Sequence, residues 1–423
     1  RSSDGGYNRP VSFSRLPLLV VLCGLTFLVG LGRPAITDSD EAFYAEAARE
    51  MRERGDWVTP HYNGEFRFEK PIFYYWLAAA SSSLGLDAEF AARLPSALAG
   101  LVLALTTFVA ARRWYDLSTA GLAGVITGTS FGYVAAGRQA LPDLTLACFI
   151  TVATYAALVV LVCPNGLTTP RQRRGWLTLV GAALAGGFLT KGPVALALPA
   201  LIVGPLALWR VWSARADGAW GQLTKDLAWL SGVLVLLSVP WFAAMTETHG
   251  VAYLDRFFMA ENVERFATAR YNNPRPFWYY LPIVAAGLLP WSPLMALWGR
   301  PAFRLLRRVR GIAVVEGWLL LWAATPLLFY SVSIGKQPRY VLPILPPLAI
   351  LLARAIARRL AEQADGRRDR TLAVAGVVSG VVVVVLGLLV YRARPLLVGV
   401  EPTVVIAGTV TLTLAGGAVV LAA

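Results

Sequence analysis

The residues best suited to chemistry in this sequence form an acidic cluster, Asp38-Ser39-Asp40-Glu41, directly after the first long apolar stretch. Three carboxylates within four residues repel one another, so at least one of them should hold a proton more readily than an isolated carboxyl group. Such a group suits a general base or a metal ligand. The structural alternative is a helix N-terminus, where acidic residues complement the helix dipole. The spacing alone leaves both interpretations open.

Basic residues lie in further short segments that contain proline, glycine or aromatic residues. Each segment has a structural alternative, such as anchoring at the membrane interface by Lys, Tyr and Trp, capping of a helix by a lone carboxylate, or a simple turn. Together they would supply cations for a phosphate group and carboxylates for acid–base chemistry. The segments are Phe68–Trp76, Gly137–Asp143, Thr190–Pro193 and Gly335–Tyr340.

The elements that position these residues are predicted to be membrane-spanning helices. Of 423 residues, 57% are hydrophobic and 15% are charged, whereas soluble domains carry about 25% charged residues. Apolar runs such as Ala92–Ala111 and Leu227–Met245 recur along the chain and are long enough to cross a hydrocarbon core of about 30 Å. We therefore predict an all-α membrane protein with about eleven to twelve spans, in a single domain over residues 1–423.

The net charge of +14 is distributed unevenly along the chain. If the N-terminus is cytoplasmic and the spans alternate, the inner segments hold 22 Lys/Arg and 8 Asp/Glu, and the remainder holds 17 of each. This is the positive-inside pattern, which places the acidic cluster on the outer side of the membrane. It also accounts for the basic charge without a nucleic acid partner. The inner segments are roughly residues 1–15, 112–118, 163–175, 210–226, 299–316 and 354–371.

Two long segments are predicted on the outer side, residues 33–90 and residues 246–277. The first should contain two amphipathic helices on the membrane surface, Glu41–Arg54 and Phe73–Leu84. Ser39 or Asp38 would cap the first helix, and Gly55 would end it.

The reactive side chains gather on the outer side, and the spans themselves are nearly free of charge. A transporter more often places ionisable groups in the middle of broken spans. The distribution therefore favours chemistry at the outer leaflet, where aromatic helices could receive a lipid and cations its phosphate.

Read together, the motifs resemble those of the GT-C glycosyltransferases of family 39 and of the aminoarabinose (lipid A) transferase group. The resemblance covers about residues 15–355 and depends on the order and spacing of the whole set. The first outer segment carries Asp38-Ser-Asp-Glu-Ala-Phe-Tyr44, Gly55-Asp-Trp-Val-Thr-Pro-His-Tyr-Asn-Gly64, Phe68-Glu-Lys-Pro71 and Phe90-Ala-Ala-Arg-Leu-Pro-Ser-Ala97. The later landmarks are Leu141-Pro-Asp143, Thr190-Lys-Gly-Pro193, Trp278-Tyr-Tyr-Leu-Pro282 and Lys336-Gln-Pro-Arg-Tyr-Val-Leu-Pro343.

The resemblance implies a role for each matching residue. Asp40 would be the active-site carboxylate and Asp143 a second one nearby. Glu69 matches a position implicated in binding a divalent metal ion, but relatives often have His where this chain has Asn262, and His is the better metal ligand. The implied substrate-binding residues are Lys70, which would hold the lipid phosphate, Tyr74, Arg265, Lys336 and Tyr340.

The implied activity is inverting transfer of a sugar from a polyprenyl-phosphate donor to a lipid, glycan or protein acceptor. It would take place at the periplasmic face of a bacterial inner membrane. Asp40 would deprotonate a hydroxyl acceptor, whereas a lipid phosphate would need no base. Larger relatives add a soluble outer domain after the last spans, and the apolar end of this chain predicts none. A transporter of polyprenyl-linked lipids and a non-catalytic scaffold of envelope biosynthesis are the alternatives.

Overall fold

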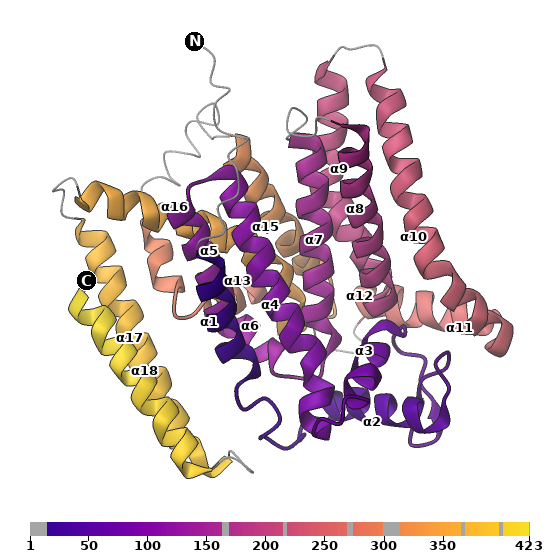
Figure 1. The fold of residues 1–423 in the computed structure, drawn as a ribbon. Helices are drawn as coiled ribbons and strands as arrows, with labels where there is room; N and C mark the ends of the chain where they lie inside the picture. Colours follow the sequence, from indigo (N-terminus) through magenta and orange to yellow (C-terminus); the bar gives the residue numbers. More distant parts are fainter. Residues whose placement is uncertain are drawn as a thin grey trace.

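The computed structural model describes residues 15–162, 169–214, 218–268, 274–298, 314–364, 369–396 and 401–422. Within these ranges the chain is almost entirely helical, and the one sheet is a two-stranded hairpin of β1 (His61–Tyr62) and β2 (Glu65–Phe66). Figure 1 shows most of the helices running side by side between the two ends of the molecule. The predicted all-α fold class is confirmed.

Eight helices in the described ranges are long and apolar enough to cross a membrane, and a bent pair could supply a ninth span. The bent pair joins Phe277–Gly287, which is η3 (Phe277–Tyr279) with α13 (Tyr280–Gly287), to η4 (Ser292–Trp298) at 109°. The eight are α4 (Ala88–Trp114), α7 (Pro142–Val162), α9 (Val194–Ala214), α10 (Ala219–His249), α15 (Val314–Val332), α16 (Leu345–Ala364) with η6 (Pro338–Ile344) before it, α17 (Arg370–Arg392) and α18 (Pro402–Ala422).

Three further helices complete the bundle. α1 (Leu16–Leu28) and α5 (Leu117–Thr129) are apolar but have only 13 residues each. α8 (Pro170–Lys191) has 22 residues, with three arginines close to its start. The described helices reach the predicted eleven to twelve spans only if α1, α5 and α8 are also counted as spans. A short helix, α6 (Phe131–Gly137), follows α5.

The arginine-rich segments and the acidic cluster lie at opposite ends of the bundle. The turn between α4 and α5 and the starts of α8 and α10 lie at the end that is uppermost in Figure 1. The outer helices α2 (Ser39–Arg54) and α3 (Phe73–Ser82) lie at the lower end. The described segments that carry the arginine excess are therefore separated from Asp40 by the length of the bundle.

The two helices predicted in the first outer segment are present. The Asp38 carboxylate caps α2 by accepting a hydrogen bond from the Asp40 backbone N–H at 2.8 Å, and Gly55 ends the helix with a φ of 69°. α3 ends at Ser82 instead of Leu84. Its buried residues are Tyr74, Tyr75, Ala78, Ala79 and Ser81, so α3 packs into the bundle mainly through its tyrosines and alanines.

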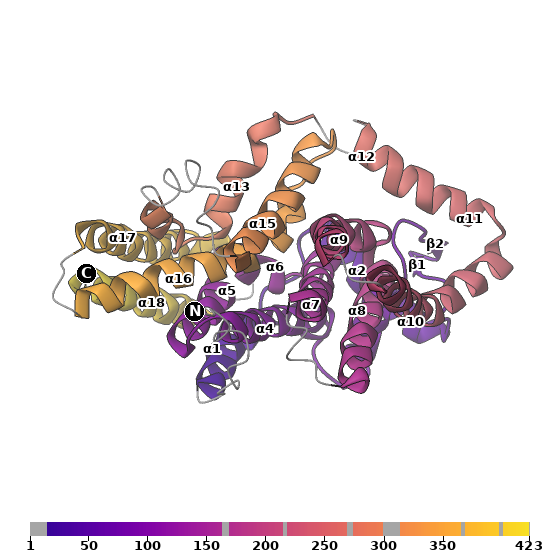
Figure 2. The same ribbon diagram turned by 90° about the horizontal axis from the view of Figure 1, so that it is seen from above.

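The second outer segment is largely helical, where the sequence predicted only a long loop. After α10 the chain forms α11 (Ala252–Asp255), the π-helix η2 (Arg256–Glu264) and α12 (Arg265–Ala267). Figure 2 shows this stretch running along the rim of the bundle, away from α10 and toward α15. π-helical turns are rare and occur mostly at functional sites.

A buried ion pair attaches the first outer segment to the bundle. Arg93 donates from Nε and Nη2 to the two carboxylate oxygens of Glu41 at 2.6 and 2.9 Å, and both side chains are at most 5% exposed. Arg93 also donates to the carbonyl groups of Leu31 and Pro34, at 3.0 and 2.5 Å. Glu41 accepts a further hydrogen bond from the Ala140 N–H at 2.8 Å. The pair thus joins α2, α4, the chain after α1 and the turn before α7.

We expect Arg93→Met to destabilise the protein strongly, because the Glu41 carboxylate would stay buried without its counter-charge. Breaking one partner of a buried ion pair costs about 3–5 kcal/mol. The thermal unfolding midpoint in detergent measures this loss. Arg49→Ala is the control, since Arg49 pairs with Glu46 and Glu53 on the exposed face of α2 and should leave the midpoint unchanged. Equal midpoints for Arg93→Met and the parent would contradict the role of the pair.

Candidate active site

One arginine brings the two predicted catalytic carboxylates together. Arg339, in η6, donates from Nη2 to Asp40 Oδ2, and its Nε lies 3.5 Å from Asp143 Oδ2. Asp40 lies in the first turn of α2 and is 45% exposed, whereas Asp143 lies in the first turn of α7 and is 6% exposed. The other Asp143 oxygen accepts a hydrogen bond from Lys191 Nζ. The two carboxylates therefore differ sharply in exposure although they share a cation.

Local sequence explains why Asp143 and Lys191 meet. Pro142 begins α7, a position where its missing N–H costs nothing, and it leaves Asp143 at the positive end of the helix dipole. Lys191 is the last residue of α8, at the negative end of that helix. Gly192 follows with a φ of 90°, and a Cβ there would lie 2.7 Å from the Phe257 ring. Glycine thus permits both the turn and the close approach of η2.

A second charged cluster joins the loop before α3 to the π-helix. Lys70 Nζ lies 3.2 Å from Glu261 Oε2, and Arg265 donates to the same oxygen at 2.8 Å. Lys70 also donates to the Glu69 carbonyl at 2.7 Å. Lys70 and Glu261 are both buried, so this network holds its charges in a region of low dielectric.

Burial alters the protonation of this cluster. Burial of Lys70, reinforced by the nearby Arg265, lowers the pKa of its ammonium group to about 8, although Glu261 opposes the shift. Burial would raise the pKa of Glu261, but Lys70 and Arg265 more than offset this effect and hold it below its usual value. A lysine with a pKa this low loses its charge in mildly alkaline solution.

A cavity of about 420 Å³ opens beside the two clusters. Lys70, Lys191, Glu261, Arg265 and Tyr340 line its polar end, where three cations outnumber one carboxylate. Lys191 Nζ lies 4.9 Å from the centre of the Tyr340 ring. Arg265 hydrogen-bonds the Tyr340 side chain. The remaining walls come mainly from apolar residues of α9, η2, α12 and α15, among them Val194, Ala197, Phe258, Met259, Val263, Phe266 and Phe329.

This arrangement suits an amphipathic anion. Three cations at one end can form charge-assisted hydrogen bonds to a phosphate group, and the apolar walls can accept a hydrocarbon chain. Lys191 lines the cavity and also binds Asp143, so a phosphate bound there would lie next to the carboxylates.

Two predicted substrate-binding residues lie outside the lining of this cavity. The Tyr74 hydroxyl is buried against α4, where it lies 3.1 Å from the Ala92 carbonyl and 2.9 Å from Ser96 Oγ. Lys336 donates from Nζ to the Ser333 carbonyl. Both side chains make contacts that hold the fold around the site, and their roles in substrate binding stay predictions.

The surroundings of Glu69 do not fit a divalent metal ion. Its carboxylate oxygens lie 3.7 Å from Arg67 and 3.8 Å from Arg256, and two guanidinium groups would repel a cation. Asn262 uses its amide group to donate to the Phe257 carbonyl at 2.8 Å. Over the described ranges, no three His, Cys, Asp or Glu side chains come close enough to hold a metal. The metal site stays a prediction, and no chemistry is derived from it.

Sequence reasoning gave no individual role to four residues of the site: Arg93, Lys191, Glu261 and Arg339. Lys191 and Arg339 were counted only among the cations that could bind a phosphate group, and Arg93 lies within a motif noted for its spacing. A usable signal was the charged side chain at the outer end of a long apolar stretch, as in Lys191 before Gly192-Pro193. Charges at such positions are costly unless they are paired, so each one points to a partner elsewhere in the chain.

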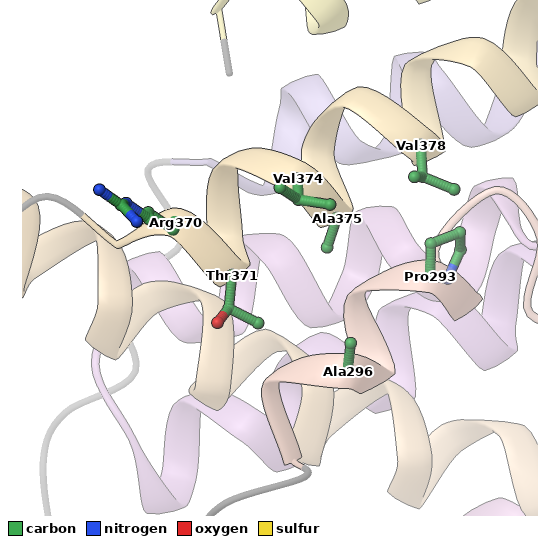
Figure 3. A pocket seen from close by; sticks show the side chains of 7 residues that line it. All are labelled: Pro293, Ala296, Arg370, Thr371, Val374, Ala375 and Val378. Atoms are coloured by element: carbon green, nitrogen blue, oxygen red, sulfur yellow. The ribbon is translucent and has the colours of Figure 1, made fainter.

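Another cavity, of about 440 Å³, lies between η4 and the start of α17. Figure 3 shows that its lining is mainly apolar, with Pro293, Ala296, Val374 and Val378 around it. Within the described part of the chain, Arg370 is its only charged lining residue. It therefore lacks the combination of carboxylates and cations that the outer cavity adjoins.

Comparison with known proteins identifies the family of the chain. The profile of the dolichyl-phosphate-mannose-protein mannosyltransferase family matches residues 34–251, which is more than half of the chain. Undecaprenyl phosphate-alpha-4-amino-4-deoxy-L-arabinose arabinosyl transferase 2 of Pseudomonas fluorescens is 35% identical over 90% of this chain. The corresponding transferase of Edwardsiella ictaluri is 36% identical over 83% of it. The chain spans 62% and 61% of the length of these two relatives.

Solved structures agree on the fold. The crystal structure of ArnT from Cupriavidus metallidurans bound to undecaprenyl phosphate superposes with a TM-score of 0.71 at 28% identity, over 97% of this chain and 78% of that one. An archaeal oligosaccharyltransferase from Archaeoglobus fulgidus shares the fold alone, with a TM-score of 0.53 at 15% identity, over 96% of this chain and 56% of that one. The chain therefore belongs to the dolichyl-phosphate-mannose-protein mannosyltransferase family and is a GT-C protein similar to the aminoarabinose transferases.

Proposed function

We propose that this protein transfers a pentose sugar from an undecaprenyl-phosphate carrier to an acceptor at the periplasmic face of the inner membrane. The observation that carries the proposal is the cavity whose cationic end adjoins two carboxylates and whose other walls are apolar. The similar transferases are named for an undecaprenyl-phosphate-linked aminoarabinose donor, and one solved relative binds undecaprenyl phosphate.

The donor phosphate would bind at the polar end of the cavity. Lys70, Lys191 and Arg265 would stabilise the negative charge that grows on the phosphate as the bond to the sugar breaks. The isoprenoid chain would lie along the apolar residues of η2 and α15. The sugar would then project toward Asp143 and Asp40, because Lys191 and Arg339 connect these groups.

The chemistry breaks the bond between the sugar C1 and the phosphate oxygen and forms a bond from C1 to an acceptor oxygen. If the acceptor is a hydroxyl, its proton passes to a carboxylate. Asp40 suits that step because it is half exposed and only one of its oxygens is held by Arg339. Asp143 is buried with both oxygens near cations, so it would position Lys191 and Arg339. A lipid phosphate acceptor would already be ionised and would need only orientation.

The same geometry disfavours the alternatives. A transporter needs ionisable groups along a path through the membrane, whereas these carboxylates and cations gather at one end of the bundle. A scaffold has no need of a cluster of buried ion pairs beside an open cavity, since removing charges from water is costly.

We expect Asp40→Asn to lower the transfer rate at least about a hundredfold, because the amide cannot accept a proton or stabilise positive charge at C1. Transfer of labelled sugar from an undecaprenyl-phosphate donor by the purified protein measures this. Asp38→Asn is the matched control. Asp38 caps α2 and Asn caps a helix about as well as Asp, so this variant should keep its activity. Near-parent activity in Asp40→Asn would shift the catalytic role away from this carboxylate.

We expect Lys70→Met to weaken donor binding about tenfold or more, since a charge-assisted hydrogen bond contributes about 1.5–3 kcal/mol. Binding should also depend on pH. The pKa of Lys70 is about 8, so the charged form is lost, and donor affinity falls, as pH rises from about 7 to about 9. Titration of the protein with a labelled donor at several pH values measures both effects.

Lys70→Met supplies its own control for the pH dependence. Its affinity should already be low at neutral pH and should change little up to about pH 9, because the titrating amine is gone. A parental pH profile retained in Lys70→Met would show that another group causes the dependence.

We expect the end of the bundle that carries α2 to face the periplasm. A cysteine replacing Glu65, which is exposed in the β hairpin, should react with a membrane-impermeant thiol reagent in intact spheroplasts. A cysteine replacing the exposed Arg358 of α16 should react only after lysis. The opposite pattern would place the active site in the cytoplasm.

A further inference from the structure

A charged cavity lies at the end of the bundle opposite to the active site. It has a volume of about 460 Å³ and lies between the first turns of α8 and α10. These helix ends lie side by side at the upper end of the bundle, far from α2 and α3 (Figure 1). The charged and aromatic residues of the lining are Arg173, Arg174, Lys225, Asp226 and Trp229.

Among the residues that the structure describes, Asp226 is the one carboxylate of this lining, and it is already neutralised. Arg173 donates to both Asp226 oxygens, from Nε at 3.1 Å and also from Nη2. Gln222 donates to Asp226 Oδ1 at 2.8 Å. Asp226 is buried, and this network joins α8 to α10 at the base of the cavity.

Two further cations of the lining, Arg174 and Lys225, take no part in the Arg173–Asp226–Gln222 network. The Arg174 guanidinium stacks 5.3 Å from the Trp229 ring, and Lys225 is exposed. Neither forms an ion pair with a carboxylate among the residues that the structure describes. The first turn of α8 is already satisfied, because Thr169 and Gln172 form a reciprocal capping box. The attraction for an anion therefore comes from side chains, with Arg174 and Lys225 in excess.

The flanks of the cavity are apolar and face outward. Leu227 and Trp229 are 48% and 43% exposed, and the apolar stretch of α10 begins here. Trp229 donates from its indole N–H to Thr178 Oγ1 at 3.0 Å, which sets the direction of the ring. Tryptophan beside arginine at the end of an apolar helix is typical of headgroup depth in a bilayer.

We propose that this cavity binds the phosphate headgroup of an anionic glycerophospholipid from the adjacent leaflet, which is the inner leaflet in the proposed topology. Basic pockets between helices at the cytoplasmic side of a membrane suit such headgroups. Arg174 and Lys225 contact the phosphate, and the acyl chains lie against Leu227 and the outer face of α10. Free phosphate is also an anion, but it would leave the apolar flank of the cavity exposed to water. A lipid is therefore the better occupant.

Native mass spectrometry of the purified protein in detergent tests the site, with dioleoyl phosphatidylglycerol and dioleoyl phosphatidylcholine as probes. The parent should retain phosphatidylglycerol in preference to phosphatidylcholine. The double variant Arg174→Gln/Lys225→Gln should bind phosphatidylglycerol roughly 25-fold more weakly, at about fivefold for each cation near the membrane surface. This double variant leaves the Arg173–Asp226 pair intact, and its circular dichroism should match that of the parent.

Arg171→Gln/Arg358→Gln is the matched control. It removes the same charge from the same end of the bundle, at exposed positions outside the cavity lining, and should keep parental affinity. Lys70→Met should also keep it, which separates this site from the donor cavity. Equal phosphatidylglycerol affinity in the parent and in Arg174→Gln/Lys225→Gln would overturn the proposal. So would an equal loss in the control or in Lys70→Met, or thermal stabilisation by inorganic phosphate as large as that by phosphatidylglycerol.

Discussion

The buried pair of Glu41 and Arg93 is the interaction on which the geometry of the candidate active site depends. Glu41 is adjacent to Asp40 in the chain, and it accepts the N–H of Ala140, three residues before Asp143. One side chain therefore sets the position of α2 and of the turn that starts α7. The contacts of Glu41 therefore position both Asp40 and Asp143, although neither of these two residues takes part in them. Buried ion pairs are seldom needed for stability, and positional specificity is their better-attested role, which agrees with a pair at this junction.

The charges around the site come close to balance, with a small positive excess. Four cations, Lys70, Lys191, Arg265 and Arg339, face three carboxylates, Asp40, Asp143 and Glu261. Unbalanced charge in a buried region is costly, so the site favours a ligand with a negative charge. A sugar linked to a lipid by a phosphodiester carries one such charge. The excess and the charge of the proposed donor therefore match, and the cavity presents three of the four cations to it.

Much of this arrangement could be predicted from the sequence. The parts that could not be predicted share one cause. The cap at Asp38, the stop at Gly55 and the two outer helices follow from local rules, since every partner lies within a few residues. Asp40 and Asp143 were predicted to be close only through family resemblance. Lys191 lies 48 positions from Asp143 in the sequence, and Arg339 lies 299 positions from Asp40. No local pattern encodes such contacts. The helical second outer segment was missed because its charges and aromatics lack an apolar repeat.

The shared arginine shows how the candidate site could serve both the proposed lipid donor and a polar acceptor. Asp40, Arg339, Asp143 and Lys191 form a continuous chain of charged contacts, from a half-exposed carboxylate to the polar end of an apolar cavity. Pairs of carboxylates with different surroundings usually take different roles. Asp143 is enclosed by cations and has no free face for an acceptor, whereas Asp40 is open to solvent. An acceptor would therefore approach Asp40 from the aqueous side while the donor enters from the lipid side, and the sugar would pass between them beside Arg339.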